Sequence, residues 1–247
     1  MTGDRFRLEA VARAFGAVRA LEGISMRIED GEFAAVVGPS GCGKTTLLNL
    51  LAGYDRPTSG HVERSGTLRM VYQEDGLFPW CTAAQNIEIG VRGVADPAQR
   101  RRQRDAMLAL IGLEGFAEHY PHQLSGGMRQ RVEFARALAG ETDSLLMDEP
   151  FSALDYLTRL RMRHELAGWL RERPRTVVLV THDIEEAAQL ADRVFVLSGR
   201  PGRVVSEHVI DVSRPRNPTD PIVVATMHAV LVDLGMERDS AGQNDVA

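Results

Sequence analysis

One stretch constrains this chain more than any other, and it reads Gly38-Pro39-Ser40-Gly41-Cys42-Gly43-Lys44-Thr45-Thr46. It fits the pattern G-x-x-x-x-G-K-[ST] of a phosphate-binding loop. An apolar run at 32–37 precedes the loop and has the length of a buried strand. A helical run at 47–52 follows and ends at Gly53, a residue that favours helix C-termini. Strand, glycine-rich loop and helix are the arrangement that this motif needs.

The residue types in this loop match the chemistry of a bound nucleotide. Glycines at 38, 41 and 43 let backbone N–H groups converge on phosphate oxygens, and the following helix adds partial positive charge at its N-terminus. We expect Lys44 to bridge the β- and γ-phosphates and the Thr45 hydroxyl to ligate Mg²⁺. At Cys42 only the backbone is needed, so the thiol is predicted to be a small filler and not a nucleophile.

Composition and charge set the broad class of protein. The 247 residues are 44% hydrophobic and 26% charged, as in a globular protein with one large domain or a domain plus a subdomain. A net charge of −5 gives no general case for nucleic-acid binding. Two cysteines, Cys42 and Cys81, make no disulfide framework and indicate a reducing compartment.

The sequence also predicts a cytosolic protein that docks on a membrane component. Its N-terminus lacks the apolar stretch of a signal peptide. The longest apolar run, around Ile222–Val232, is too short for a membrane span of roughly 20 residues.

Three further strand ends supply candidate catalytic groups. An apolar strand at 144–147 ends in Asp148-Glu149. In nucleotide hydrolases with this loop an Asp at that position holds Mg²⁺, and we expect Glu149 to polarise the attacking water. Gln73 and His182 also end predicted strands. Gln73 is expected to ligate Mg²⁺ and sense the γ-phosphate, and His182 to donate a hydrogen bond to that phosphate.

A second anion-binding helix end is predicted at Leu124-Ser125-Gly126-Gly127-Met128. Ser125 can cap the helix that follows, and the two glycines let a ligand approach its N-terminus. One site has little use for two γ-phosphate cradles, whereas two copies arranged head to tail would use both. Phe15, beside Gly16, is a candidate platform for the nucleotide base, and an edge aromatic packed on a sheet is the alternative.

Taken in order, these motifs resemble those of the ATP-binding-cassette (ABC) transporter ATPases. The resemblance runs from Phe15 to about Arg203 and adds a D-loop, Ser152-Ala153-Leu154-Asp155, which implies that Asp155 lies near the nucleotide. Met128 and Ser144 depart mildly from the usual pattern. The resemblance implies that ATP binding closes a dimer over two nucleotides, and that hydrolysis, with Glu149 as base, reopens it and drives a membrane permease.

The same resemblance implies an α/β fold of the P-loop NTPase type. A RecA-like core with an antiparallel β-subdomain is expected at 5–74 and 136–213, and an inserted helical subdomain at about 75–135. A C-terminal helix is expected at about 221–234, followed by a flexible tail at 236–247.

Narrower features resemble the ATPases of taurine, aliphatic sulfonate and nitrate importers; they are the stretches 73–80, 181–187 and 197–203. Within the first, Leu77, Phe78, Pro79 and Trp80 are predicted to form an apolar patch that contacts the permease, and core packing of Phe78 and Trp80 is the alternative. The subfamily implies a peripheral protein on the cytoplasmic face of the cell membrane, an indirect link to a periplasmic or lipid-anchored solute-binding protein, and no nucleic acid. The basic run at 100–104 is expected to be a solvated helix face.

Two interpretations from other classes stay open. A soluble ABC ATPase without a permease usually has a long coiled coil between the segments of Gln73 and Ser125, or two cassettes, and this sequence has neither. A P-loop kinase would not need the Ser125 loop. The solute is not fixed by the sequence: taurine or a sulfonate is favoured, and nitrate or bicarbonate is the alternative.

Overall fold

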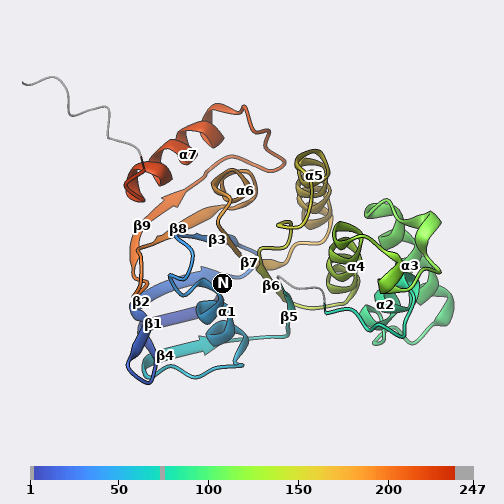
Figure 1. Ribbon diagram of the computed structural model, residues 1–247, viewed down its shortest axis with the longest axis horizontal. Helices are drawn as coiled ribbons and strands as arrows, with labels where there is room; N and C mark the ends of the chain where they lie inside the picture. Colours follow the sequence, from blue (N-terminus) through green and yellow to red (C-terminus); the bar gives the residue numbers. More distant parts are fainter. Residues whose placement is uncertain (1–2, 73–75, 237–247) are drawn as a thin grey trace, which may run out of the picture. The chain divides into compact units, whose positions relative to one another are not determined.

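A computed structural model describes residues 3–72 and 76–236 of the chain (Figure 1). The chain forms two compact units, which are 1–65 with 178–247 (unit 1) and 66–177 (unit 2). The subdomain boundaries expected at 75 and 135 stay a prediction. Gln73 and the tail from 237 lie outside the described residues.

Unit 1 contains an antiparallel sheet in the order β2-β1-β4. Its strands are β1 (Asp4–Phe15), β2 (Val18–Glu29) and β4 (Ser59–Arg64). Leu8 lies opposite Met26 in the register of β1 and β2, and both side chains are buried. The alternating burial of β2 from Ile24 to Ile28 follows the period of two that the sequence shows there.

The second sheet of unit 1 carries the functional loops. Its strands are β3 (Phe33–Val37), β7 (Thr176–Thr181), which begins just before the unit boundary, β8 (Arg193–Leu197) and β9 (Val204–Val209). They lie in the order β7-β3-β8-β9; β3 and β8 are parallel, and β9 is antiparallel to β8. Every residue of β3 and β7 is buried, which explains the apolar sequence of β3 and of the centre of β7.

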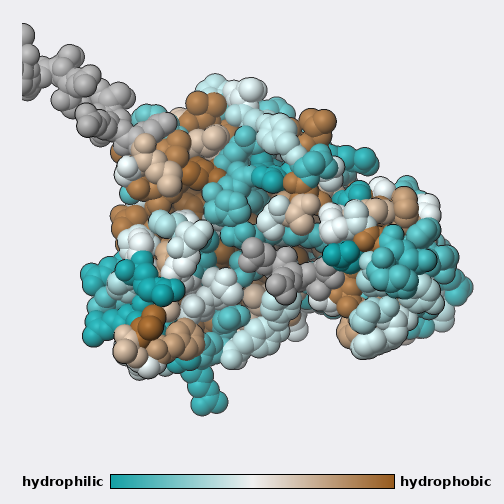
Figure 2. Space-filling model, viewed as in Figure 1, coloured by the Kyte–Doolittle hydropathy of each residue, from teal (hydrophilic) through white to brown (hydrophobic). Residues whose placement is uncertain are grey.

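In the part of unit 1 that the structure describes, three helices accompany the sheets: α1 (Lys44–Ala52), α6 (Ile184–Leu190) and α7 (Pro221–Asp233). Apolar side chains gather over α7 and β9 in Figure 2, and the exposed ones are Val205, Val209 and Val224. No helix among the described residues is long and apolar enough to cross a membrane.

Unit 2 is mainly helical. Two parallel strands, β5 (Leu68–Val71) and β6 (Ser144–Asp148), pair with Val71 opposite Met147. The helices are α2 (Ala83–Gly90), α3 (Pro97–Leu110), α4 (Gly126–Ala139) and α5 (Tyr156–Glu172), with short 3-10 turns η1 (Glu114–Phe116) and η2 (Pro121–Gln123). Helices α2 and α4 approach so closely that a Cβ on Gly90 would overlap the carbonyl oxygen of Arg136.

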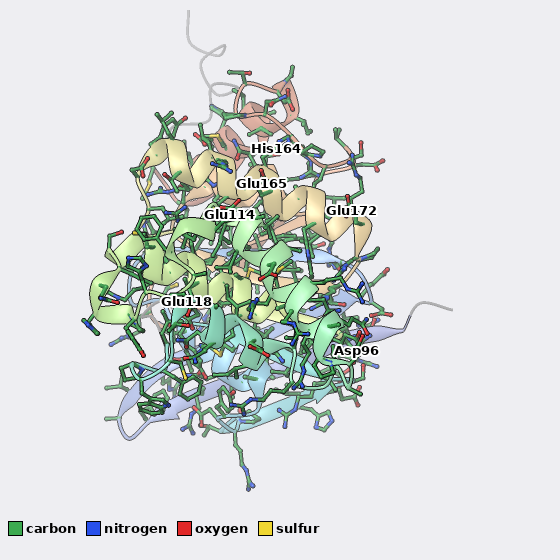
Figure 3. The ribbon with its side chains drawn as sticks, turned by 90° about the vertical axis from the view of Figure 1, so that its right-hand side faces the viewer. Asp96, Glu114, Glu118, His164, Glu165 and Glu172 are labelled. Carbon is green, nitrogen blue, oxygen red and sulfur yellow. The ribbon has the colours of Figure 1, made fainter. Side chains whose placement is uncertain are left out.

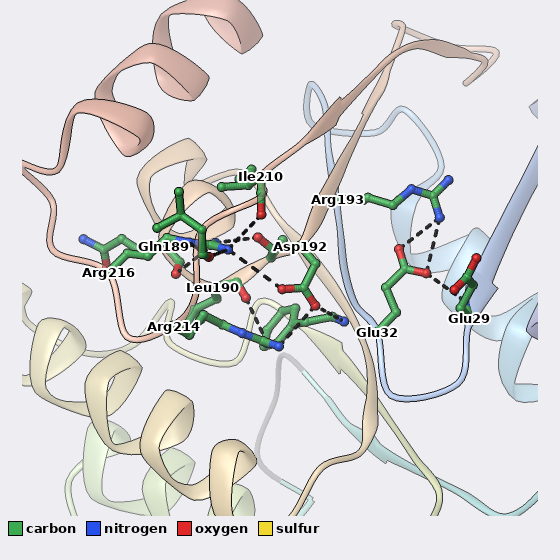
Figure 4. A network of polar contacts seen from close by, with 12 residues as sticks. Glu29, Glu32, Gln189, Leu190, Asp192, Arg193, Ile210, Arg214 and Arg216 are labelled. Atoms are coloured by element: carbon green, nitrogen blue, oxygen red, sulfur yellow. Dashed lines mark hydrogen bonds and ion pairs between the residues drawn. The ribbon is translucent and has the colours of Figure 1, made fainter. Parts of the chain in front are cut away.

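A buried arginine ties the chain beyond β9 to the end of α6 (Figure 4). The Arg216 guanidinium, only 6% exposed, donates to the carbonyl oxygens of Ala191 at 2.6 Å, Ala188 at 3.3 Å and Ile210 at 3.2 Å. The last carbonyls of a helix have no partner within the helix and carry partial negative charge, so a cation is stabilising there. Arg216 therefore fixes the segment that leads into α7.

We predict that Arg216→Ala destabilises the protein by about 3 kcal/mol and lowers its melting temperature by about 6–12 °C, because several buried carbonyls lose a charged donor. Arg19→Ala is the control, since the Arg19 side chain is 69% exposed and pairs with Glu22 at the surface. The control is expected to change stability by less than about 0.5 kcal/mol. Thermal unfolding followed by circular dichroism measures both, and equal melting temperatures for the two variants would contradict the assignment.

Candidate nucleotide site

The phosphate-binding loop joins β3 to α1 and is shaped by close backbone approach. Gly43 caps α1 in the left-handed region with φ of 106°, where a Cβ would lie 2.8 Å from the carbonyl oxygen of Ala20. A Cβ on Gly38 would lie 2.9 Å from the carbonyl oxygen of Leu197. Both positions therefore require glycine for steric reasons, and Gly43 requires it also for its left-handed backbone conformation.

The stretch 197–203 supports the loop from the other side. The Gly202 N–H donates to the Ala20 carbonyl at 2.9 Å, and a Cβ on Gly202 would overlap the carbonyl oxygen of Cys42. The Arg200 guanidinium donates to the Gly41 carbonyl at 3.2 Å. The sequence marked this stretch only as a subfamily resemblance, and the structure gives it a physical role beside the phosphate loop.

Lys44 and Cys42 are both buried, but Lys44 is a hydrogen-bonded cation and Cys42 is a neutral thiol. The Lys44 ammonium donates to the carbonyl oxygens of Gly38 at 2.7 Å and Pro39 at 3.1 Å, so it lies over the loop. Burial raises the pKa of the Cys42 thiol above its ordinary value. A neutral, buried thiol is a poor nucleophile, as expected for a filler residue.

Three other predicted site residues belong to unit 1. Thr45 is exposed in the first turn of α1, and His182 is exposed directly after β7. Phe15 is half exposed at the end of β1, with the Arg13 guanidinium 4.3 Å from its ring centroid. An exposed ring is available to a flat ligand, and the role of Phe15 as a platform for the base stays a prediction.

Unit 2 carries the acidic pair. Asp148 ends β6 and is 5% exposed, whereas Glu149 has a φ of 47°, in a region that non-glycine residues seldom adopt. The buried Gln130 of α4 holds this turn: its amide nitrogen lies 3.4 Å from the Glu149 carbonyl, and its amide oxygen accepts from the Ala153 N–H at 3.1 Å. The surrounding contacts thus maintain an unfavourable backbone conformation at a predicted catalytic residue.

The Ser125 loop begins the same helix. The Ser125 hydroxyl accepts from the Met128 N–H at 3.3 Å and caps α4, as predicted. A Cβ on Gly127 would lie 3.1 Å from the Leu154 side chain, so glycine lets the D-loop come close to the start of α4. Asp155 caps α5 by accepting from the Thr158 N–H at 3.0 Å. Hydrogen bonds from the Thr158 side chain, first, and from its backbone N–H lower the pKa of Asp155.

Comparisons with known proteins agree on the family. The sequence model of the ABC transporter family matches residues 21–152. The taurine import ATP-binding protein TauB of Burkholderia pseudomallei is 45% identical over 217 residues, covering 84% of this chain and 83% of that protein. The aliphatic sulfonates import ATP-binding protein SsuB 1 of Mesorhizobium japonicum is 44% identical over 218 residues, covering 85% of this chain and 81% of that protein.

This chain belongs to the ABC transporter family. The fold agrees: the dimeric structure of MJ0796, a bacterial ABC transporter cassette, matches with a TM-score of 0.75 at 33% identity and covers 84% of this chain and 99% of that one. The same cassette in a post-hydrolysis state bound to ADP and Pi matches with a TM-score of 0.74. The P-loop NTPase fold predicted from the sequence is therefore confirmed, and so is the family.

Some residues of the apolar patch predicted to contact a permease are buried, and others are exposed. Leu77 is 9% exposed and belongs to the core of unit 2, whereas Trp80 is 72% exposed. The rings of Phe78 and Trp80 lie 5.6 Å apart, with Phe78 half-buried. Core packing, the alternative for these two aromatics, is wrong for Trp80.

No sequence pattern identified several of the residues that hold these motifs in place. Gln130 and Arg200 contact the acidic turn and the phosphate loop, but each is distant in sequence from the residues it holds. The signal for Gly202 was present in the stretch 197–203, where a glycine follows a proline, yet nothing in the sequence indicates that it faces Cys42.

Because Gly202 faces the Cys42 carbonyl, we predict that Gly202→Ala distorts the phosphate loop and weakens ATP binding at least about tenfold. Gly199→Ala, in the same loop, is the matched control, since a Cβ at Gly199 meets nothing within 4 Å. Equilibrium binding of a fluorescent ATP analogue measures both affinities. Wild-type affinity in Gly202→Ala would show that the loop does not depend on this contact.

Proposed function

We propose that this chain is the ATP-hydrolysing subunit of an importer for a small organic anion, with taurine or an aliphatic sulfonate as the favoured solute and nitrate or bicarbonate as the alternative. The observation that best supports ATP hydrolysis is that Gln130 holds the turn of Glu149 against the helix that begins at Ser125. The names of the relatives TauB and SsuB 1 support import and the choice of solute.

In the proposed reaction each residue has one role. Lys44 and the backbone N–H groups of 41–46 bind the β- and γ-phosphates, and Phe15 stacks on the base. Glu149 accepts a proton from water as the water oxygen attacks the γ-phosphorus, the bond from that phosphorus to the β,γ-bridging oxygen breaks, and ADP leaves. His182 donates a hydrogen bond to the γ-phosphate. Ser125, Gly126 and Gly127 of a second copy bind the same γ-phosphate at the N-terminus of α4, with Asp155 nearby.

The residue types predicted to hold a magnesium ion together with a nucleotide have the chemistry that this ion prefers. Thr45 offers an exposed hydroxyl, Asp148 a carboxylate at a strand end, and Gln73 is the third predicted ligand. Oxygen ligands of this kind, few in number and completed by phosphates and water, suit Mg²⁺. Among the described residues, no group of three or more His, Cys, Asp or Glu side chains is arranged to hold a metal. When bound, the ion would neutralise phosphate charge.

Transport follows from a difference in affinity between two states. ATP contacts both copies only in the closed dimer, so it favours closure by that difference in binding free energy. We propose that the exposed ring of Trp80, with Phe78 and Pro79, passes closure to a membrane permease. The protein would then lie at the cytoplasmic face of the membrane and depend only indirectly on a solute-binding protein outside.

Two experiments separate this function from its rivals. ATP hydrolysis that needs no metabolite acceptor excludes a P-loop kinase. Co-purification with a permease from detergent extracts of membranes excludes a soluble ABC ATPase. Growth of a gene-deletion strain on taurine, sulfonate or nitrate identifies the solute. The strain should fail to grow only on the solute that this importer transports.

Substitutions at Glu149 and Lys44 are predicted to separate turnover from binding. Glu149→Gln should retain ATP binding, lower turnover by about 10²–10⁴-fold because the proton acceptor is lost, and trap a dimer. Lys44→Ala should weaken ATP binding itself at least about tenfold. ATP binding, phosphate release and light scattering measure affinity, turnover and mass. Unchanged turnover in Glu149→Gln would refute Glu149 as the base, and unchanged affinity in Lys44→Ala would refute the phosphate contact.

A further inference from the structure

The segment from Gly76 to Thr82 exposes Trp80 but is firmly attached to α2. Asn86 of α2 is fully buried, and its amide oxygen accepts from the Phe78 N–H at 2.8 Å. The amide nitrogen of Asn86 lies 3.0 Å from the Cys81 carbonyl and 3.2 Å from that of Phe78. A side chain that satisfies backbone groups on several residues of a loop holds that loop in one conformation.

Helix α4 holds the same segment through two charged side chains. Glu133, 1% exposed, accepts from the Gly76 N–H at 3.2 Å, and Arg136 donates to the Gly76 carbonyl at 2.9 Å. The Arg136 guanidinium also lies 5.6 Å from the centroid of the Phe78 ring and 3.6 Å from the Glu133 carboxylate. Both backbone groups of Gly76 are therefore held by α4.

Gln130, Glu133 and Arg136 are spaced by three residues and lie along adjoining turns of one helix. Gln130 holds the turn of Glu149, and Glu133 and Arg136 hold Gly76. Ser125 caps the start of the same helix, about 16 Å before Arg136 at 1.5 Å per residue. A displacement of the α4 N-terminus is thus carried along a rigid element to the segment that exposes Trp80.

We propose that Glu133, together with Arg136, is a positioning residue that couples the ATP-facing end of α4 to the segment from Gly76 to Thr82. The proposal rests on the proposed function, because it is ATP that moves α4. A buried carboxylate that is paired and hydrogen-bonded costs much to separate from its partners, so the contact persists when the helix moves. Asn86 keeps the rest of the segment rigid, so the movement reaches Trp80.

Trp80 itself provides the readout. The chain has two tryptophans, and Trp169 is 7% exposed, so Trp169→Phe leaves an exposed indole as the only tryptophan. In this background we expect a slowly hydrolysed ATP analogue with Mg²⁺ to change the emission of Trp80. Glu133→Ala should reduce that change at least about fivefold, with the affinity for the analogue and basal ATP hydrolysis within about twofold of the parent.

Two further variants make the test specific. Glu118→Ala is the matched control, since Glu118 is an exposed carboxylate at the outer surface of the same unit (Figure 3), and the emission change should remain. Glu133→Gln keeps the size of the side chain but leaves Arg136 without its carboxylate, and it should also reduce the change. This variant decides the question if Glu133→Ala fails to fold by circular dichroism.

The outcomes are distinct. An emission change in both Glu133 variants equal to that of the parent would overturn the proposal, as would ATP binding to the parent with no change at all. Failure of the parent to bind the analogue would overturn the proposed function and this proposal with it. Loss of the emission change in the Glu133 variants alone, with nucleotide binding retained, supports the coupling.

Discussion

The phosphate loop keeps its shape because backbone packs directly on backbone around it. Gly38 lies against Leu197, Gly43 against Ala20, and Gly202 against Cys42, each with no room for a Cβ. These contacts draw β2, β8 and the stretch 197–203 around one loop. Its N–H groups are therefore fixed before a nucleotide arrives, and a preorganised site loses less free energy on binding than one that must order itself.

In unit 2, helix α4 is the element that holds the functional loops in place. It begins at the Ser125 cap, and its buried Gln130 and Glu133 reach the turn of Glu149 and the backbone of Gly76. Polar side chains inside a helical unit are costly unless each is satisfied. Gln130 and Glu133 each hold a different functional element, which explains why this helix is not entirely apolar on its buried face.

The sequence predicted where the functional loops lie along the chain, but not the contacts that hold them in place. Local apolar runs predicted the acidic pair directly after one strand and His182 at the end of another, because those signals are local. Strand β9 ends at Val209, and beyond it the Arg216 guanidinium donates to the carbonyl oxygen of Ile210. No local pattern could predict that contact, since it joins residues from separate elements.

The same reasoning explains Trp80. Four apolar residues in a row do not reveal which side chains enter a core, and here Leu77 is buried while Trp80 is exposed. Asn86 fixes the backbone of this segment, because its amide oxygen accepts from the Phe78 N–H and its amide nitrogen donates to the Cys81 carbonyl. No local pattern in the sequence indicates this role.

The central claim is that each ATP site combines the phosphate loop of one copy with the Ser125 loop of another. Subunit mixing tests it most directly. A Lys44→Ala chain and a Ser125→Arg chain should each be inactive alone, yet their mixed dimer would contain one site with both halves intact. ATP hydrolysis should therefore recover on mixing to roughly a quarter of the wild-type rate, since half of the dimers are mixed and each has one working site. A mixture as inactive as its separate components would contradict the account.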